Sequence, residues 1–147
     1  MQDTLASVLG HKGSTVHSVA PNATVLDAVR KMNEERIGAL LVCEASEMLG
    51  IFTERDVLCR VVDSPRDPAT TRVYEVMTTE VVAVDPSTSV EEAMAVISEK
   101  RCRHLPVLEK GTLRGLVSIG DLTRWASRNQ ESHIQHLVNF ITGQYPA

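Results

Sequence analysis

The chain has 147 residues, of which 43% are hydrophobic and 23% charged, the balance of an ordinary soluble protein with one compact domain or two small halves. A formal net charge of −4 and only 3% aromatic residues argue against nucleic-acid binding, because the surface repels phosphates and offers few rings to stack on bases. No apolar run approaches the roughly 18 residues of a membrane-spanning helix, and no signal peptide is evident at the N-terminus. The sequence predicts a cytoplasmic protein that binds neither nucleic acid nor membrane.

The chain contains one unit of sequence twice. Residues 16–21 (VHSVAP) recur as 81–86 (VVAVDP), and residues 50–56 (GIFTERD) recur as 115–121 (GLVSIGD). Both pairs are offset by 65 positions, so no net insertion or deletion separates the copies between these anchors. Such a repeat determines how the rest of the chain is interpreted.

Each copy opens with a short β-branched run, at 16–19 and 81–84, which stops just before a proline and is predicted to be a strand. A helix is then predicted to begin at Thr24 in the first copy and at Ser89 in the second. Each of these residues has an acid three positions later, the pattern of a capping box, and apolar residues follow at helical spacing.

The second part of each copy consists of strands and one more helix. Continuous apolar runs predict strands buried on both faces, at 39–43 and 49–52, then at 105–108 and 113–117. A helix is predicted after each pair, at 56–62 and 121–126. A domain of about 60 residues buries little apolar surface, so we expect the copies to pack through their sheets around a shared core.

These elements predict an α/β (α+β) fold of two β-α-β-β-α repeats related by a pseudo-twofold axis. The predicted boundaries are 8–64 for the first repeat, 65–79 for a linker with two prolines, and 80–128 for the second repeat. Residues 129–147 carry apolar residues at helical spacing and are predicted to form an amphipathic helix that packs on the module or on a second subunit.

A tandem unit that ends each time in Gly-apolar-apolar-Thr/Ser-x-x-Asp resembles the CBS domain family, and two such units resemble a Bateman module. Further marks of the resemblance are RHLPV at 103–107 and Val-Met-Thr at 76–78. The chain resembles small bacterial proteins that consist of this module alone. The resemblance implies a regulatory module in signal transduction that binds AMP, ADP, ATP, S-adenosylmethionine or an NAD-type ligand between its repeats, changes conformation and catalyses no reaction.

The candidate ligand-binding residues of each copy lie in its Thr/Ser-x-x-Asp motif. The carboxylate of Asp56 can accept hydrogen bonds from both hydroxyls of a ribose, and the Thr53 hydroxyl can add a donor. Ser118 and Asp121 repeat the arrangement. The same spacing also fits a capping box, which explains these residues without a ligand. Arg55 favours the ligand hypothesis, because a cation in a first helical turn opposes the helix dipole unless an anion binds there.

The family resemblance implies that the other copy completes each cleft. The Asp56 cleft would gain residues near 79–82, with Thr79 and Val81, and the segment Cys102, Arg103 and His104. The Asp121 cleft would gain Val16 to Ser18 (Val16 and Ser18 in particular) and the segment Ile37, Gly38 and Ala39. The clefts are therefore unequal, and the cationic one, at Asp56, is expected to prefer phosphorylated ligands. Without the resemblance, Arg103 and His104 would more often be solvated surface residues.

Cysteine and histidine residues raise three further questions, about catalysis, metal binding and disulfides. Cys102 beside Arg103 and His104 suggests a catalytic nucleophile, but it has no evident orienting partner, so no enzymatic activity is predicted. Metal binding is not predicted either, since the pair His133 and His136 has no evident third ligand. The cysteines are odd in number and far apart in the sequence, so they are expected to be reduced thiols: Cys43, Cys59 and Cys102.

The main alternative to a nucleotide sensor is an interaction or dimerisation module that needs no ligand. Two-repeat modules resemble half-discs that pair into a disc, so a homodimer is expected under either hypothesis. The sequence does not identify the effector protein that such a module would control.

Overall fold

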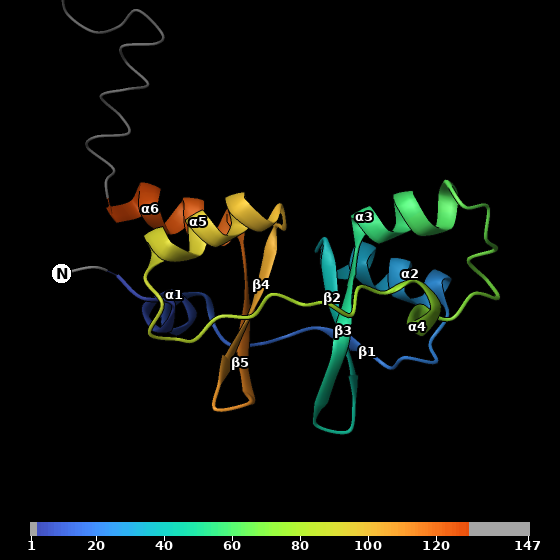
Figure 1. The fold of residues 1–147 in the computed structure, drawn as a ribbon, viewed down its shortest axis with the longest axis horizontal. Coiled ribbons are helices and arrows are strands. Elements are labelled where there is room, and N and C mark those ends of the chain that lie inside the picture. Colours follow the sequence, from blue (N-terminus) through green and yellow to red (C-terminus); the bar gives the residue numbers. More distant parts are fainter. Residues whose placement is uncertain (1–2, 130–147) are drawn as a thin grey trace, which may run out of the picture.

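The computed structural model of the chain describes residues 3–129. Two halves of mixed helix and strand lie side by side, and the chain crosses between them (Figure 1). Two small sheets and their helices form two repeats, as the sequence predicts. The amphipathic helix predicted for 129–147 lies, beyond Asn129, outside the described residues.

The first half is built on a three-stranded sheet. Strand β1 (Ser18–Val19) pairs in parallel with β2 (Ala39–Glu44), and β2 pairs antiparallel with β3 (Glu47–Thr53). Helix α2 (Val25–Glu35) connects β1 to β2. It begins after Thr24, whose hydroxyl accepts a hydrogen bond of 3.1 Å from the Asp27 N–H, as the predicted cap requires.

After β3 the chain forms one helical turn, α3 (Glu54–Asp56), and continues as the π-helical segment η1 (Val57–Val62). The helix predicted at 56–62 is thus present but starts two residues earlier and changes type. Residues 63–70, between η1 and the next element, are exposed, as expected of a connecting loop.

The second half repeats this plan with a smaller sheet. Strands β4 (His104–Glu109) and β5 (Thr112–Ser118) form an antiparallel hairpin between helices α5 (Val90–Lys100) and α6 (Ile119–Asn129). A full capping box joins Ser89 and Glu92 at the start of α5. The strand predicted at 81–84 is reduced to an isolated parallel bridge between Val84 and Val107. In the first half the corresponding strand, β1, is also shorter than predicted.

Two short helices each pack on the half formed by the copy that is farther from them in the sequence. Helix α1 (Leu5–Lys12) precedes the first copy but buries Leu5, Val8 and Leu9 in the core of the second. Helix α4 (Val73–Val76) precedes the second copy but buries two valines in the core of the first. Figure 1 shows α1 beside β5 and α4 beside α2. The predicted boundaries follow the order of the chain, whereas the packing pairs each of these helices with the more distant copy.

Backbone hydrogen bonds show that these two short helices dock in the same way. The Leu5 N–H donates to the Thr88 carbonyl oxygen at 2.9 Å, and the Val73 N–H donates to the Ala23 carbonyl oxygen at 2.8 Å. Each bond fixes the start of the short helix to the loop in front of a longer one, α5 or α2. The two halves therefore share one docking geometry.

The halves meet through their sheets, as predicted. A cluster of buried residues on β2 and β3 (Ala39, Leu41 and Ile51) packs against partly buried side chains that include Leu113 and Leu116 of β5. Two further clusters fill the individual halves. No helix within residues 3–129 is long and apolar enough to span a membrane.

Candidate functional site

The Asp56 carboxylate lies at the junction of β3 and α3 and is 5% exposed. Its Oδ2 accepts from the Thr53 N–H at 3.0 Å, and the Thr53 hydroxyl lies 3.3 Å from both Oδ2 and the Asp56 N–H. These contacts form the capping box that the spacing predicts. Asp56 and Thr53 are therefore structural as well as being candidate ligand contacts.

Thr78, the last residue of the Val-Met-Thr motif, and Arg60 were not predicted as ligand contacts, but they complete the surroundings of Asp56. The Thr78 hydroxyl donates to Oδ1 of Asp56 at 2.9 Å, and the Thr78 N–H donates to the carbonyl oxygen of Ile51 at 2.9 Å. Arg60 lies with Nε 3.9 Å from Oδ1 and donates to the carbonyl oxygen of Met77 at 2.8 Å. Arg55, the cation expected at this cleft, is exposed.

The Asp121 carboxylate has the same local cap but different partners. Its Oδ2 accepts from the Ser118 N–H at 2.8 Å, and the Ser118 hydroxyl accepts from the Asp121 N–H at 3.1 Å. Lys12 Nζ lies 2.7 Å from Oδ2, and Arg124 Nη2 lies 2.8 Å from Oδ1. Two cations thus contact Asp121 directly, one from the distant helix α1 and one from α6.

The cations around Asp121 also affect its ionisation. Burial raises the pKa of Asp121, but hydrogen bonds from Lys12 and Ser118 and the charge of Lys12 outweigh it, and the net pKa lies below the ordinary value. The carboxylate is therefore ionised at neutral pH and can accept hydrogen bonds from a ligand.

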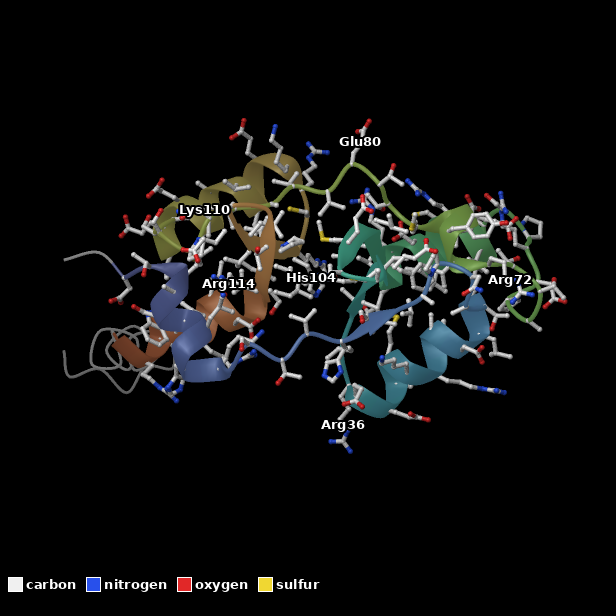
Figure 2. All side chains as sticks on the ribbon, turned by 90° about the horizontal axis from the view of Figure 1, so that it is seen from below. Arg36, Arg72, Glu80, His104, Lys110 and Arg114 are labelled. Atoms are coloured by element: carbon white, nitrogen blue, oxygen red, sulfur yellow. The ribbon has the colours of Figure 1, made fainter. Side chains whose placement is uncertain are left out.

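His104 lies between the halves, at the start of β4 (Figure 2). It pairs with Ser118 across the hairpin, and its Cε1 is 3.7 Å from the position that a Cβ on Gly38 would occupy. Burial lowers the pKa of His104, while the charges of Asp121 and Glu54 raise it; the net pKa lies below 6.5. Glu54 belongs to the motif of the first copy and Asp121 to that of the second. Charges from both motifs therefore act on the pKa of His104.

The segments before β2 and β4 lie beside the motif of their own copy. The Gly38 carbonyl oxygen accepts from the Glu54 N–H at 3.1 Å, and Ala39 of β2 is paired with Thr53 of β3 in the antiparallel sheet. In the second copy the Arg103 carbonyl oxygen accepts from the Ile119 N–H at 2.9 Å. The close approach of the His104 ring to the backbone at Gly38 brings the two copies together here. Ile37 is half-buried in the core of the first half, Cys102 is half-buried against that of the second, and the Arg103 residue is exposed.

The segments at 16–18 and 79–82, also predicted to complete the clefts, are less closely associated with the two motifs. Val16 and Val81 are half-buried at the packing between the sheets. The Ser18 carbonyl oxygen accepts from Lys31 Nζ at 2.5 Å, and the exposed Thr79 accepts from the Val81 N–H at 3.0 Å through its carbonyl oxygen. Among the hydrogen bonds of residues 3–129, none joins these four residues to Asp56 or Asp121.

Two hollows accompany these residues. One, of about 110 Å³, lies between α1 and α6 at Asp121 and is lined mainly by polar and aromatic side chains: His11, Lys12, Asp121, Arg124, Trp125 and Arg128. The other, of about 580 Å³, is open and lies at the far end of the first half, with Cys43, Tyr74 and Met77 in its walls. The smaller hollow is the one that belongs to a predicted site residue.

Two of the three cysteines, Cys43 and Cys102, are half-buried. Burial raises the pKa of Cys43 and of Cys102, so both favour the unreactive thiol form. Within residues 3–129 no three His, Cys, Asp or Glu side chains are grouped to hold a metal ion. His133 and His136 lie outside the described residues.

Comparison with known proteins assigns the repeat to a family. The model of the CBS domain matches residues 13–63 and 73–128, which together make up most of the chain. The chain belongs to the CBS domain family. Its two domains form a CBS pair, a kind of module that is generally regulatory.

Relatives share this CBS pair over most of their length. The chain is 35% identical to the CBS domain-containing protein YhcV of Bacillus subtilis, over 80% of this chain and 84% of that protein. It is 34% identical to the mitochondrial protein CBSX3 of Arabidopsis thaliana, over 97% of this chain and 73% of that protein. Among solved structures, a putative signal-transduction protein with CBS domains from Burkholderia ambifaria matches with a TM-score of 0.83 and 45% identity, over 86% of this chain and 96% of that one.

Proposed function

We propose that this CBS pair is a sensor of adenine nucleotides (AMP, ADP, ATP or NAD) that binds its ligand at Asp56 and Asp121 and catalyses no reaction on it. The observation that carries the proposal is that both motifs place a carboxylate at a helix start where the two halves approach each other. His104 supports this placement, because it lies close to Glu54 of one motif and Asp121 of the other. A ligand there would contact both halves, so its binding would favour one relative position of the halves over another.

The chemistry of the site suits an adenosine ligand. An ionised carboxylate accepts from the two hydroxyls of a ribose, and such charge-assisted hydrogen bonds are roughly twice as strong as neutral ones. The half-buried Ile37, Val81 and Cys102 offer apolar surface for a base. The proposal includes the residues expected from the sequence on both sides of each cleft, and it requires no metal.

A second candidate function is supported by the contacts of Asp56. Its carboxylate is already bonded to Thr53 and Thr78, so the fold needs no ligand at this position. In addition, Leu58 and Val62 of η1 are 63% and 66% exposed, and Tyr74 of α4 is 56% exposed. A ligand-independent interaction module would use such apolar side chains to bind another protein or a second copy.

Thermal unfolding with added ligand separates these functions. Because ligand that binds only the folded state stabilises it, a concentration of about 100 times the dissociation constant should add ~2.7 kcal/mol. AMP, ATP, NAD and S-adenosylmethionine should be compared, with Asp56→Asn and Asp121→Asn as variants. We expect at least one ligand to raise the melting temperature of the parent and to do so less in one of the variants. No shift with any of them would favour the interaction module.

We also propose that the protein is a homodimer. Leu58 and Val62, two exposed apolar side chains of η1, support this, because a monomer rarely exposes a large contiguous apolar patch. The matching positions of the second copy are polar, Thr123 and Ser127. A related CBS-CP12 protein from bloom-forming cyanobacteria, 32% identical with a TM-score of 0.74, is described as hexameric. The effector that such an assembly would control is an unidentified protein.

A further inference from the structure

Lys12 contacts Oδ2 of Asp121, the carboxylate oxygen that also accepts from the Ser118 N–H. Its Nζ lies 2.7 Å from Oδ2 of Asp121 and donates to the Leu116 carbonyl oxygen at 2.7 Å. The corresponding place in the first half is taken by Thr78, which bonds Ile51 through its N–H and Asp56 through its hydroxyl. A neutral hydroxyl thus donates to Asp56, with Arg60 Nε 3.9 Å from the same oxygen, whereas the Lys12 ammonium lies 2.7 Å from Asp121. The two clefts differ in charge because of residues outside the repeated motif.

The backbone of Lys12 is held in place by the packing of α1, whereas its long side chain can rotate. Helix α1 is anchored by Leu5, Val8 and Leu9, of which the first two are almost fully buried. The Lys12 side chain is 31% exposed and the Asp121 side chain 13% exposed. The ammonium can therefore move by rotation of its own side chain while α1 stays docked on the second half.

The hollow beside this ion pair has further positive charge. Arg124 and Arg128 line it together with Lys12, and Asp121 is the acidic side chain in its wall. Arg124 pairs with Asp121, and Arg128 contacts the His11 ring. With a volume of about 110 Å³ it is smaller than the roughly 300 Å³ of a complete ligand pocket. It suits a phosphate-sized anionic group.

Charge balance then separates two kinds of ligand. When ribose hydroxyls bind to Oδ2 of Asp121, they displace Lys12 and leave a partly buried ammonium without its counter-charge, which is unfavourable. Adenosine supplies no replacement, whereas a nucleotide supplies a phosphate. We propose that Lys12 makes the Asp121 cleft selective for phosphorylated adenosine ligands, its ammonium passing from the carboxylate to the phosphate as the ligand binds. This inference rests on the proposed function and assigns the phosphate preference to Asp121, not to Asp56 as the sequence suggests.

Trp125 provides a reporter for this cleft. It is the chain's one tryptophan, it lines the hollow beside Lys12 and Asp121, and its ring packs edge-on against His11 at 5.8 Å between centroids. Its fluorescence should be titrated with adenosine and with AMP at equal ionic strength, in parallel with calorimetry. We expect the parent to prefer AMP. Lys12→Met keeps the aliphatic chain and removes the charge, and it should weaken AMP binding about tenfold or more while leaving adenosine unaffected or tighter.

Two further variants make the result specific. Lys12→Arg keeps the charge and should keep the preference for AMP. Lys110→Met removes a lysine in the turn between β4 and β5 that is not among the residues lining the hollow, and it should change neither affinity. Circular dichroism and melting temperature establish that each variant is folded.

Each outcome of the experiment is informative. If Lys12→Met retains the preference for AMP, or if the parent shows none, the role of Lys12 is overturned while nucleotide binding stands. If AMP binds by calorimetry but leaves Trp125 unchanged, the phosphate selectivity does not belong to this cleft and the inference fails. If neither ligand binds by either method, the proposed function fails and the inference fails with it.

Discussion

Leu9 lies against Gly115 so closely that a Cβ at position 115 would come within 2.6 Å of the Leu9 side chain. These residues are far apart in the sequence, and their contact brings helix α1 onto strand β5. In the first half, a Cβ at Gly50 would come within 2.6 Å of the Thr78 carbonyl oxygen. Both contacts hold the segment that precedes one copy against a strand of the other.

The two glycines should differ in their tolerance of alanine. Gly50→Ala meets a backbone oxygen held by the bridge between Ile51 and Thr78, so we expect it to lower the free energy of unfolding by ~1–3 kcal/mol. Gly115→Ala should cost less, because the Leu9 side chain can rotate away. Urea denaturation measures both.

Gly10 is the matched control for these substitutions. It lies in α1 and has open space where a Cβ would be, so Gly10→Ala should stabilise the protein by ~0.5–1 kcal/mol. A Gly50→Ala variant as stable as the parent would show that the Thr78 segment is not held as described.

Stability and affinity should separate at Asp56. Thr78→Val removes the hydroxyl that donates to Oδ1 and should lower the free energy of unfolding by ~1–3 kcal/mol, because a buried carboxylate oxygen loses a partner. Asp56→Asn keeps an oxygen for the Thr53 N–H and an amide group for Thr78. We expect it to fold and to bind nucleotide roughly tenfold to a hundredfold more weakly, by calorimetry. Equal nucleotide affinity in Asp56→Asn and parent would mean that the carboxylate serves only as a helix cap.

Asp121 should contribute to stability at neutral pH and less in acid. Burial raises its pKa, but hydrogen bonds from Lys12 and Ser118 hold the net pKa below that of an unfolded Asp, about 3.9. The contribution is therefore complete above about pH 3.9 and is lost as pH falls through the lower folded pKa. Urea denaturation of the parent and Asp121→Asn at several pH values should show a stability difference that shrinks in this acid range. A difference that stays constant would contradict the pairing with Lys12.

His104 should be neutral at pH 7. Burial lowers its pKa, and the charges of Lys12 and Arg103 lower it further. The charges of Asp121 and Glu54 raise the pKa, but the net value lies below 6.5. An unfolded histidine titrates near 6.5, so this residue's contribution to stability is present above that pH and is lost as pH falls through the lower folded pKa. An NMR titration of the imidazole should give a midpoint below 6.5, and a midpoint above it would mean that the carboxylates dominate. If protonation of His104 affects ligand affinity, the affinity should change at pH values below 6.5.

The proposed dimer can be tested at η1. A charge in a buried apolar interface is unfavourable, so Val62→Asp should dissociate the dimer. Sedimentation of the parent at micromolar concentration should give about twice the chain mass of 16.1 kDa, and the variant should sediment near 16.1 kDa. Ser127→Asp changes the matching position of the second copy and should leave the parent's mass unchanged. A parent that sediments near 16.1 kDa would rule out the homodimer.

Local patterns in the sequence determined the repeated fold. Thr24 and Ser89 begin helices because their hydroxyls satisfy backbone donors a few residues away, and the apolar runs that became β2 and β4 are contiguous in the chain. The constant offset of the copies then identified a tandem repeat, and the resemblance of its motifs to the CBS domain family implied Asp56 and Asp121 as ligand contacts. The strands at 16–19 and 81–84 were overestimated, because β-branched residues indicate an extended chain but not the hydrogen-bonding partner that a strand requires.

The tertiary structure alone decided which distant residues contact the two carboxylates. The spacing of Leu5, Val8 and Leu9 shows an apolar helix face but not which copy it covers, and that choice places Lys12 on Asp121. The same holds for Thr78, which reaches Asp56 only because α4 packs back on the first half. Caps and strands form between residues close in sequence, where spacing specifies geometry. Contacts between distant segments depend on how whole apolar surfaces fit together, and no local pattern records that fit.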